Sequence, residues 1–361
     1  MASKNCFKLL GRVPLSLMGK AERIEIVRSI EKIRGSYVVC YVTSTRENVI
    51  SPMAMDAPRK IYEHLRVLPG KANIDLFLHS NGGEATVPWR LVTLIREYAK
   101  EFRVLIPHRA FSAATLTAMG ADAIVMHPMA MLGPTDPTVG NDFNPQDPLN
   151  PQRRIGISVE DVTAYFALVR EDAAIEGEAY RLEAFEKLAS SVHPLALGNV
   201  KRHLSLSRLM AHKLLTLHMD PTRDAAKIDQ IVENLTSKLF YHGHPINRRE
   251  AREQVGLATV QDASDELERL MWSLYAEYEG EMRMEEPFRP DVEFLARFPD
   301  LQPMPGQPWK VTPPALLRTA AIESVNFSDF YEMEYEVSGE KQPTGMTNIA
   351  MITRRQGWVR V

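Results

Sequence analysis

One serine and one pair of glycines have the types and surroundings needed to handle an acyl group. Ser112 lies at a break between a predicted strand and a predicted helix, where its hydroxyl would sit near the positive end of the helix dipole. Gly82 and Gly83 directly follow an apolar strand, and glycines there can take positive φ and turn their N–H groups outward. Two such donors can stabilise the charge on a tetrahedral intermediate. Each feature alone is also compatible with a helix cap or a plain turn.

The elements around these residues predict that the two features meet. Apolar strands alternate with amphipathic helices: the strands are predicted at 74–78, 103–107 and 123–126, and the helices at 88–98 and 112–120. This is an α/β pattern, in which sites form beyond the carboxyl ends of parallel strands. Because Leu78 and Pro107 end two such strands, we expect the glycine pair and Ser112 to face the same crevice.

The rest of the chain predicts a three-part organisation. Upstream lie a helix at 22–35, a buried strand at 36–44 and a helix at 56–68. Downstream lie a Pro- and Asn-rich loop at 136–154 and helices at 158–188, 195–217, 225–240, 247–254 and 262–281. Prolines then recur from 288 to 314, and alternation over 329–361 predicts antiparallel strands. We therefore divide the chain into an N-terminal helical segment (1–35), a main domain (36–285) and a proline-rich linker with a small β appendage (286–361).

Composition is that of a soluble globular protein. The 361 residues are 45% hydrophobic and 25% charged, with a net charge of −3, which gives no basic excess for a nucleic-acid partner. Cys6 and Cys40 make no disulfide framework, and Arg12 and Pro14 interrupt the N-terminal apolar run that an export signal would need. We expect a cytoplasmic protein without a stable membrane anchor. The pair His242 and His244 lacks a third ligand at useful spacing and favours a turn over a metal site.

Several short motifs together resemble the serine dehydrogenase proteinase family, in the clan of the Clp proteolytic subunit, signal peptide peptidase A and the crotonases. The specific matches are Asn81-Gly82-Gly83, Ser112-Ala113-Ala114-Thr115-Leu116, Gly120-Ala121-Asp122 and Leu132-Gly133-Pro134-Thr135-Asp136-Pro137. Weaker matches are Pro194 to Gly198, Phe240 to Ile246, and Gly357-Trp358. Despite the family's name, no dinucleotide glycine fingerprint follows a strand.

The resemblance implies a fold and an activity. The fold would be a Clp/crotonase-like spiral ββα core with a helical C-terminal region and a small β appendage. The activity would be that of a serine endopeptidase on peptides or unfolded proteins, with no metal and no organic cofactor. Ser112 would be the nucleophile, and Gly82 or Gly83 together with Ala113 would bind the oxyanion. By resemblance only, we also expect a homo-oligomer.

The general base is the open part of this prediction. Thr135 stands about where the Clp subunit has its histidine, and strand alternation places His127 at the other end of the sheet as a structural residue. Relatives of the signal-peptide-peptidase type use a desolvated lysine instead. Lys187, Lys201 and Lys213 follow Ser112, and Lys201 is the preferred candidate because it follows a family-like segment. Asp136 is a further option as an acidic or orienting partner.

Two other functions stay open. The chain could be a catalytically inactive descendant that binds peptides or a partner, since its base is unassigned. It could also be a crotonase-like acyl-CoA enzyme, which uses the same oxyanion hole on a thioester. The serine at the helix start, flanked by small residues, favours the peptidase over the acyl-CoA enzyme.

Overall fold

The structure is a computed structural model of the 361-residue chain. It describes residues 18–135, 138–148, 150–173, 177–237, 243–290, 292, 309–310, 315–341 and 347–361. Among these residues no helix is both long and apolar enough to span a lipid bilayer.

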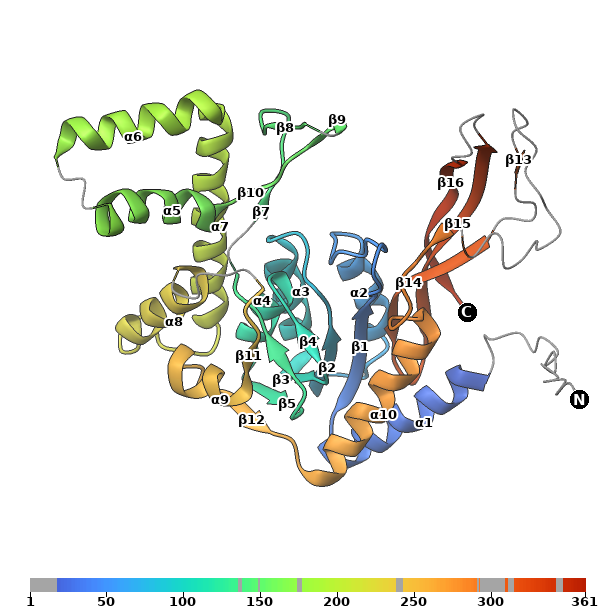
Figure 1. Ribbon diagram of the computed structural model, residues 1–361. Helices are drawn as coiled ribbons and strands as arrows, with labels where there is room; N and C mark the ends of the chain where they lie inside the picture. The colour runs from blue at the N-terminus through green and yellow to red at the C-terminus, as the bar shows by residue number, and fades with distance from the viewer. Residues whose placement is uncertain are drawn as a thin grey trace, which may run out of the picture.

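A single large sheet organises the molecule (Figure 1). Its parallel half contains β12 (Val260–Asp262), β5 (Ala123–Met126), β3 (Ala99–Ile106), β2 (Ala72–His79) and β1 (Tyr37–Thr43), in that spatial order. Its antiparallel half continues from β1 through β14 (Ala315–Glu323) and β15 (Ser328–Lys341), which pairs with both β13 (Trp309–Lys310) and β16 (Thr347–Arg360). The near-continuous apolar sequence of β1 suits its position, because all seven residues are buried.

Helices cover both faces of the parallel strands, as Figure 1 shows. Leu76 and Leu78 face a core shared with α2 (Ala57–Leu65), α3 (Val87–Tyr98) and α4 (Ala113–Met119). Phe77 lies between them in sequence and points to the other face, where α1 (Met18–Arg34) and α10 (Asp265–Met282) pack. This alternation follows from the two-residue period of a strand, and it leaves β2 buried on both sides.

A second, three-stranded sheet lies beside the carboxyl ends of the main strands. It consists of β4 (Arg109–Ala110), β6 (Met131–Leu132) and β11 (Ile246–Asn247). A bridge between Ser80 and Ala110 joins it to the chain that leaves β2. The predicted α/β fold with a spiral ββα core is therefore confirmed.

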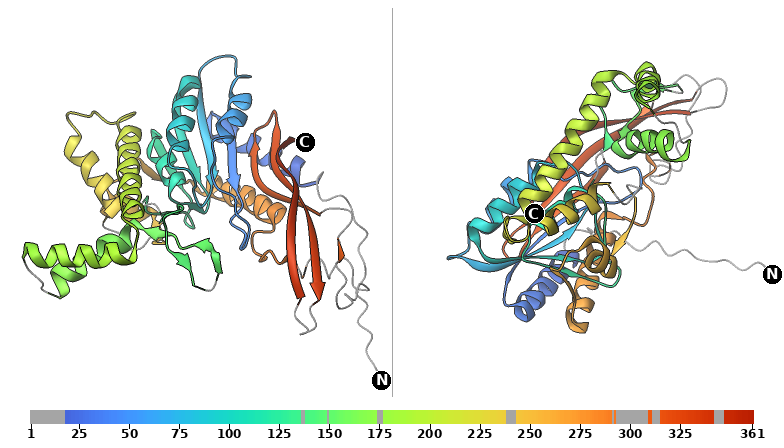
Figure 2. Two further views of the ribbon diagram at one scale, coloured as in Figure 1. Left: turned by 90° about the horizontal axis from the view of Figure 1, so that it is seen from above. Right: turned by 90° about the vertical axis from the view of Figure 1, so that its left-hand side faces the viewer.

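The chain between β6 and β12 is mostly helical, and its part at 159–191 projects from the body of the protein (Figures 1 and 2). Its α-helices are α5 (Val159–Ala167), α6 (Glu178–Ser191), α7 (Pro194–Leu215), α8 (Ala225–Ser237) and α9 (Arg248–Glu250). The single helix predicted over 158–188 is wrong: α5 runs into a π-helical turn, η1 (Leu168–Asp172), and α6 starts after Gly177. Gly177 has φ 108°, which a continuous helix cannot contain. A second π-helical turn, η2 (Ala251–Val255), follows α9.

Short strand pairs occur where a plain loop was predicted at 136–154. β8 (Gln146–Asp147) pairs with β9 (Asn150–Arg154), and β7 (Thr138–Val139) pairs with β10 (Ile157–Ser158). Pairs of two residues carry too little alternation to be recognised in a sequence.

The antiparallel strands predicted near the C-terminus are present as β15 and β16, and most of the proline-rich stretch 288–314 lies outside the described residues. The preceding strand β14 was not predicted. It pairs with β1, so that Ala321 and Phe330 share a core with Phe77 and α10. The C-terminal strands therefore extend the main sheet.

A buried carboxylate fastens these strands to α2. Asp329 on β15 bonds with Lys60 at 3.2 Å, His64 at 3.2 Å and Arg360 at 2.7 Å, and its side chain is fully buried. Burial alone would raise the pKa of Asp329, but the bonds from His64, Arg360 and Lys60 outweigh it and hold this pKa well below its ordinary value.

We expect Asp329→Asn to lower the free energy of unfolding at pH 7 by about 3 kcal/mol or more, because three basic groups lose their buried partner. A carboxylate with a lowered pKa stabilises the fold above its unfolded pKa, and this contribution is lost as the pH falls below about 4. Urea denaturation should therefore show that the difference in the free energy of unfolding between wild type and Asp329→Asn becomes smaller as the pH is lowered from 7 to 3. The exposed Asp229→Asn serves as the control. A difference that stays constant with pH would contradict the lowered pKa of Asp329.

Candidate active site

Ser112 lies on a sharp turn between β4 and α4. Its φ of 51° and ψ of −116° are unusual for a residue with a side chain, and the hydroxyl-bearing residue is only half-buried. The turn is fixed from both sides: Phe111 N–H donates to Ser80 O at 3.0 Å, and Ala114 N–H donates to Phe111 O at 2.9 Å. A backbone held in such a conformation is a feature found at functional sites.

The glycine pair lies directly against this turn. Gly82 has φ 95°, and a Cβ atom there would stand 2.6 Å from Phe111 O and 2.8 Å from Ser112 Cβ. Only glycine allows the two segments to approach so closely. The structure thus brings Ser112 and the glycine pair together at the carboxyl ends of β2 and β3.

Some backbone N–H groups around Ser112 already donate a hydrogen bond within the protein, and others are available to a ligand. Gly82 N–H donates to Ser80 Oγ at 3.0 Å, and Ser80 Oγ also accepts from the Thr43 hydroxyl at 2.8 Å. By contrast, the N–H groups of Gly83 and Ala113 donate to no other residue in the part of the chain that the structure describes. Ala113 is the first residue of α4, where backbone N–H groups have no partner within the helix. Gly83 is exposed to solvent.

Met53 holds the second glycine in place. Met53 N–H donates to Gly82 O at 2.8 Å, and Glu84 N–H donates to Met53 O at 2.9 Å. A Cβ atom on Gly83 would lie only 2.2 Å from Met53 O, so this backbone contact also requires glycine. The segment before α2 therefore fixes the direction of the Gly83 N–H, a role that sequence reasoning missed.

Thr115 ties the start of α4 to the small sheet. Its hydroxyl lies 2.7 Å from Ala110 O and 2.8 Å from Gly133 O, and it accepts from Gly133 N–H at 3.1 Å. The Phe111 ring packs against Gly133, where a Cβ atom would be 2.8 Å from the ring. These contacts hold the segment that begins at Leu132 against the Ser112 turn.

The predicted base candidates lie in different places. Lys201 is exposed on α7, Lys187 is on α6, and the Lys213 ammonium stands 5.0 Å above the Trp89 ring. Asp136 lies outside the described residues. Within the described ranges no side chain forms a hydrogen bond with the Ser112 hydroxyl.

Thr135, which the sequence comparison predicts to stand about where the Clp subunit has its histidine, joins the helical region to the core. Its N–H donates to Leu235 O at 2.9 Å, and its carbonyl accepts from the Ser207 hydroxyl at 2.5 Å. It therefore fastens the segment after β6 to both α7 and α8.

Three histidines gather on the α10 side of the same sheet edge. His79 stacks on His108 with ring centroids 5.7 Å apart, and His127 stacks on Trp272 at 5.1 Å. The prediction that His127 lies at the other end of the sheet is wrong, because β5 is parallel to β3 and His127 follows its carboxyl end. Burial lowers the pKa of all three rings, that of His79 well below its ordinary value.

Only one histidine of the pair His242 and His244 lies in the described part of the chain. His244 bonds with Glu250 at 2.7 Å, and His242 lies outside the described residues.

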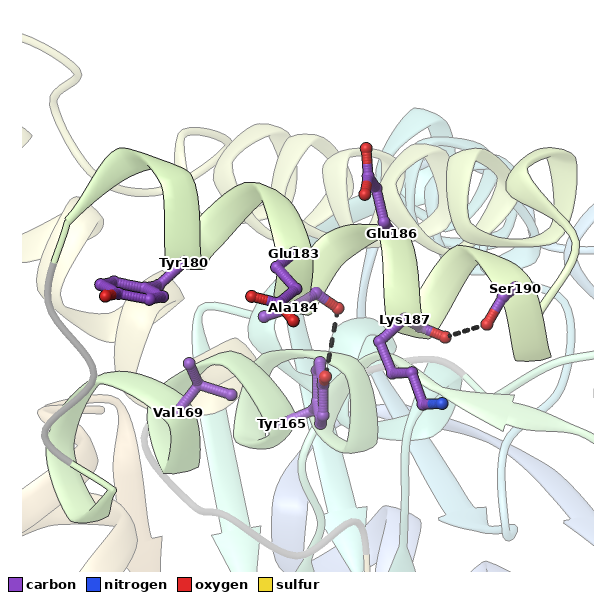
Figure 3. Close-up of a pocket in the computed structure, with 8 residues that line it drawn as sticks. All are labelled: Tyr165, Val169, Tyr180, Glu183, Ala184, Glu186, Lys187 and Ser190. Atoms are coloured by element: carbon purple, nitrogen blue, oxygen red, sulfur yellow. Dashed lines mark hydrogen bonds between the residues drawn. The ribbon is translucent and has the colours of Figure 1, made fainter.

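A cavity of about 510 Å³ lies in the helical region and not at Ser112. It is lined by α5, η1 and α6, and Figure 3 shows Tyr165 pointing its hydroxyl toward the Ala184 carbonyl between the two α-helices. A smaller cavity of about 210 Å³ lies between the Met53 segment and the C-terminal strands; Trp358 lines it and donates to Asp56 at 2.8 Å.

The main sheet, the small sheet beside it and the turn at Ser112 define an α/β protein of the ClpP-like fold. Residues 14–176 match the family of ClpP-like SDH-type serine proteinases, which confirms the resemblance over that part of the chain.

The chain is also similar to two uncharacterized proteins of Methanocaldococcus jannaschii. One is 27% identical over 168 residues, which cover 45% of this chain and 57% of the relative. The other is 30% identical over 124 residues, covering 33% and 43%. This chain thus matches about half the length of these curated relatives. Among solved structures, a mutant of the 1510-N membrane-bound stomatin-specific protease is similar, with 16% identity, a TM-score of 0.33, and coverage of 58% of this chain and 72% of that one.

Proposed function

We propose that this protein is a serine peptidase that cleaves peptides or unfolded proteins through an acyl-enzyme on Ser112. The observation that carries this proposal is the contact between Gly82 and the Ser112 turn, in a segment that matches a serine proteinase family. Attack of the Ser112 hydroxyl on a peptide carbonyl would place negative charge on the carbonyl oxygen, which nearby N–H groups must stabilise.

We assign the oxyanion donors to Gly83 and Ala113. Sequence alone left Gly82 and Gly83 as alternatives, but the Gly82 N–H already donates to Ser80. In this proposal Gly82 is the spacer that lets the loop approach Ser112, and Gly83 is the donor whose direction Met53 fixes.

Lys201 is the proposed general base, as in Ser–Lys peptidases. A lysine amine becomes a base only when burial removes its water, and Lys201 is exposed in the single chain. The proposal therefore requires that substrate or a second copy of the chain covers this part of α7 and that the Lys201 amine comes within hydrogen-bond reach of Ser112. An assembly of several copies, which the resemblance implies, would supply such a cover.

A fluorophosphonate probe tests this proposal directly, because it reacts with serines that a neighbouring base has activated. We expect the probe to block casein cleavage and to label Ser112, as mapped by peptide mass spectrometry, with no labelling after heat denaturation. Lys201→Met should abolish the labelling, while Lys213→Met, which removes a lysine from the same helix, should leave it intact.

Each result has a distinct meaning. Labelling of Ser112 that survives Lys201→Met would exclude Lys201 as the base and keep the peptidase. A native protein that neither reacts with the probe nor cleaves casein would contradict the proposed function. It would favour the inactive peptide-binding protein, which agrees with a serine that has no bonded base in the described part of the single chain.

A further inference from the structure

Arg109 links the two segments that form the candidate site. It lies on β4, three residues before Ser112, and one of its terminal nitrogens donates to Asn81 Oδ1 at 3.3 Å. Asn81 directly precedes the glycine pair. The guanidinium also lies 5.4 Å from the centre of the Phe111 ring, next to Ser112.

The positive charge of Arg109 has no acidic partner among the residues that the structure describes. Its Nε atom is buried and has no hydrogen-bond acceptor, and the guanidinium's one hydrogen bond within the described ranges is with the neutral Asn81 amide. A buried donor without an acceptor is costly, and such groups in native proteins call for an explanation. The neighbouring rings offer no counter-charge, because His79 and His108 are imidazoles whose pKa values burial and Arg109 hold low.

Other arginines of the protein do have carboxylate partners. Arg103 and Arg34 both bind the buried Asp75, and Arg96 binds Asp122. Arg109 is half-buried like these residues and yet lacks a carboxylate in the described chain. The two terminal nitrogens of a guanidinium can bind both oxygens of a carboxylate.

We propose that Arg109 is a specificity residue that binds a carboxylate of the substrate beside Ser112. This inference rests on the proposed peptidase function, since it places the carboxylate on a peptide. The carboxylate can be the C-terminal group of the peptide or an Asp or Glu side chain. The terminal nitrogens, one of which reaches the exposed Asn81 side chain, would hold the carboxylate and position the neighbouring peptide bond at the serine.

A binding experiment on the Ser112→Ala variant tests this inference without relying on cleavage. A peptic digest of casein is divided, and the carboxylates of one half are blocked as methyl esters. Both halves are incubated with the protein at low salt, and retained peptides are counted by filtration and mass spectrometry. We expect blocking to reduce retention about 10-fold or more, as for other charge-assisted hydrogen bonds.

Two further variants and two peptide changes sharpen the result. Adding Arg109→Gln should remove the preference for unblocked peptides, while Arg90→Gln, which removes an exposed charge from the nearby α3, should keep it. Retained peptides are also synthesised again with a C-terminal amide or with Gln in place of Glu. Loss of retention with the amide identifies the C-terminal carboxylate as the bound group, and loss of retention with Gln identifies the side chain.

The inference is overturned if blocked and unblocked peptides are retained equally, if neither is retained, or if Arg109→Gln keeps the preference. In these cases Arg109 only holds the Asn81 segment. The comparison of blocked with unblocked peptides on the Arg109-containing protein remains decisive even if Arg109→Gln fails to fold. If the carboxylate preference is absent but the probe still labels Ser112, only the role of Arg109 is contradicted and the proposed peptidase function is kept. If the probe does not label Ser112 but the carboxylate preference is clear, the peptidase function is contradicted and Arg109 is kept as a carboxylate-binding residue.

Discussion

Replacing Ser112 with alanine should reduce casein cleavage at least about 1000-fold, because loss of a nucleophile removes the covalent route altogether. The Ala variant keeps the Cβ atom and the φ of 51°, so its thermal stability should match that of wild type. Ser205→Ala, on the exposed face of α7, is the matched control and should retain full activity.

Ser112→Gly adds a second readout, because glycine takes positive φ without strain. It should lose as much activity as Ser112→Ala, but its free energy of unfolding should be about 1 kcal/mol higher than that of wild type. Cleavage that persists in both variants would exclude Ser112 as the nucleophile. Equal stability of the Gly and Ala variants would show that the turn carries no strain.

Gly83→Ala should damage stability and activity together. The new Cβ atom would meet the Met53 backbone at 2.2 Å, and a backbone cannot move aside as a flexible side chain can. We expect a loss of about 2–3 kcal/mol in the free energy of unfolding, as for an overpacked core. Displacement of the Gly83 N–H should also abolish fluorophosphonate labelling of Ser112.

Gly280→Ala is the control for this experiment. Gly280 lies in α10 with open space around its Cβ position, so alanine there should raise stability by about 0.5–1 kcal/mol. Urea denaturation of the two variants compares the effects directly. Normal stability and normal labelling in Gly83→Ala would mean that the loop is free to move and that Met53 does not fix the donor.

The local part of the site could be predicted from the sequence. Paired glycines after a buried strand and a serine before a helix of small residues are short-range signals, and the α/β alternation placed both at one sheet edge. Gly82 and Ser112 are in contact for the reasons that the sequence offered, namely backbone freedom at one residue and a strand-to-helix break at the other.

The long-range part could not be predicted. Met53 supports Gly83 through backbone bonds, which place no demand on the Met53 side chain and leave no mark in the sequence. The position of Lys201 depends on where α7 packs, and the unpaired Nε of Arg109 is visible only once its neighbours are placed. His127 was misplaced because alternation gives the face of a strand but not the end of the sheet.

The pairing of β1 with β14 affects how the protein is made. β1 is an apolar strand, and the strand that closes its second edge, β14, is made only after all the other parallel strands of the sheet. A ribosome therefore releases β1 long before its antiparallel neighbour exists, and an unpaired apolar edge can associate with other chains. Contacts so distant in sequence also form slowly. We expect newly synthesised chains to depend on chaperones until the last strands arrive, and C-terminally shortened chains to aggregate.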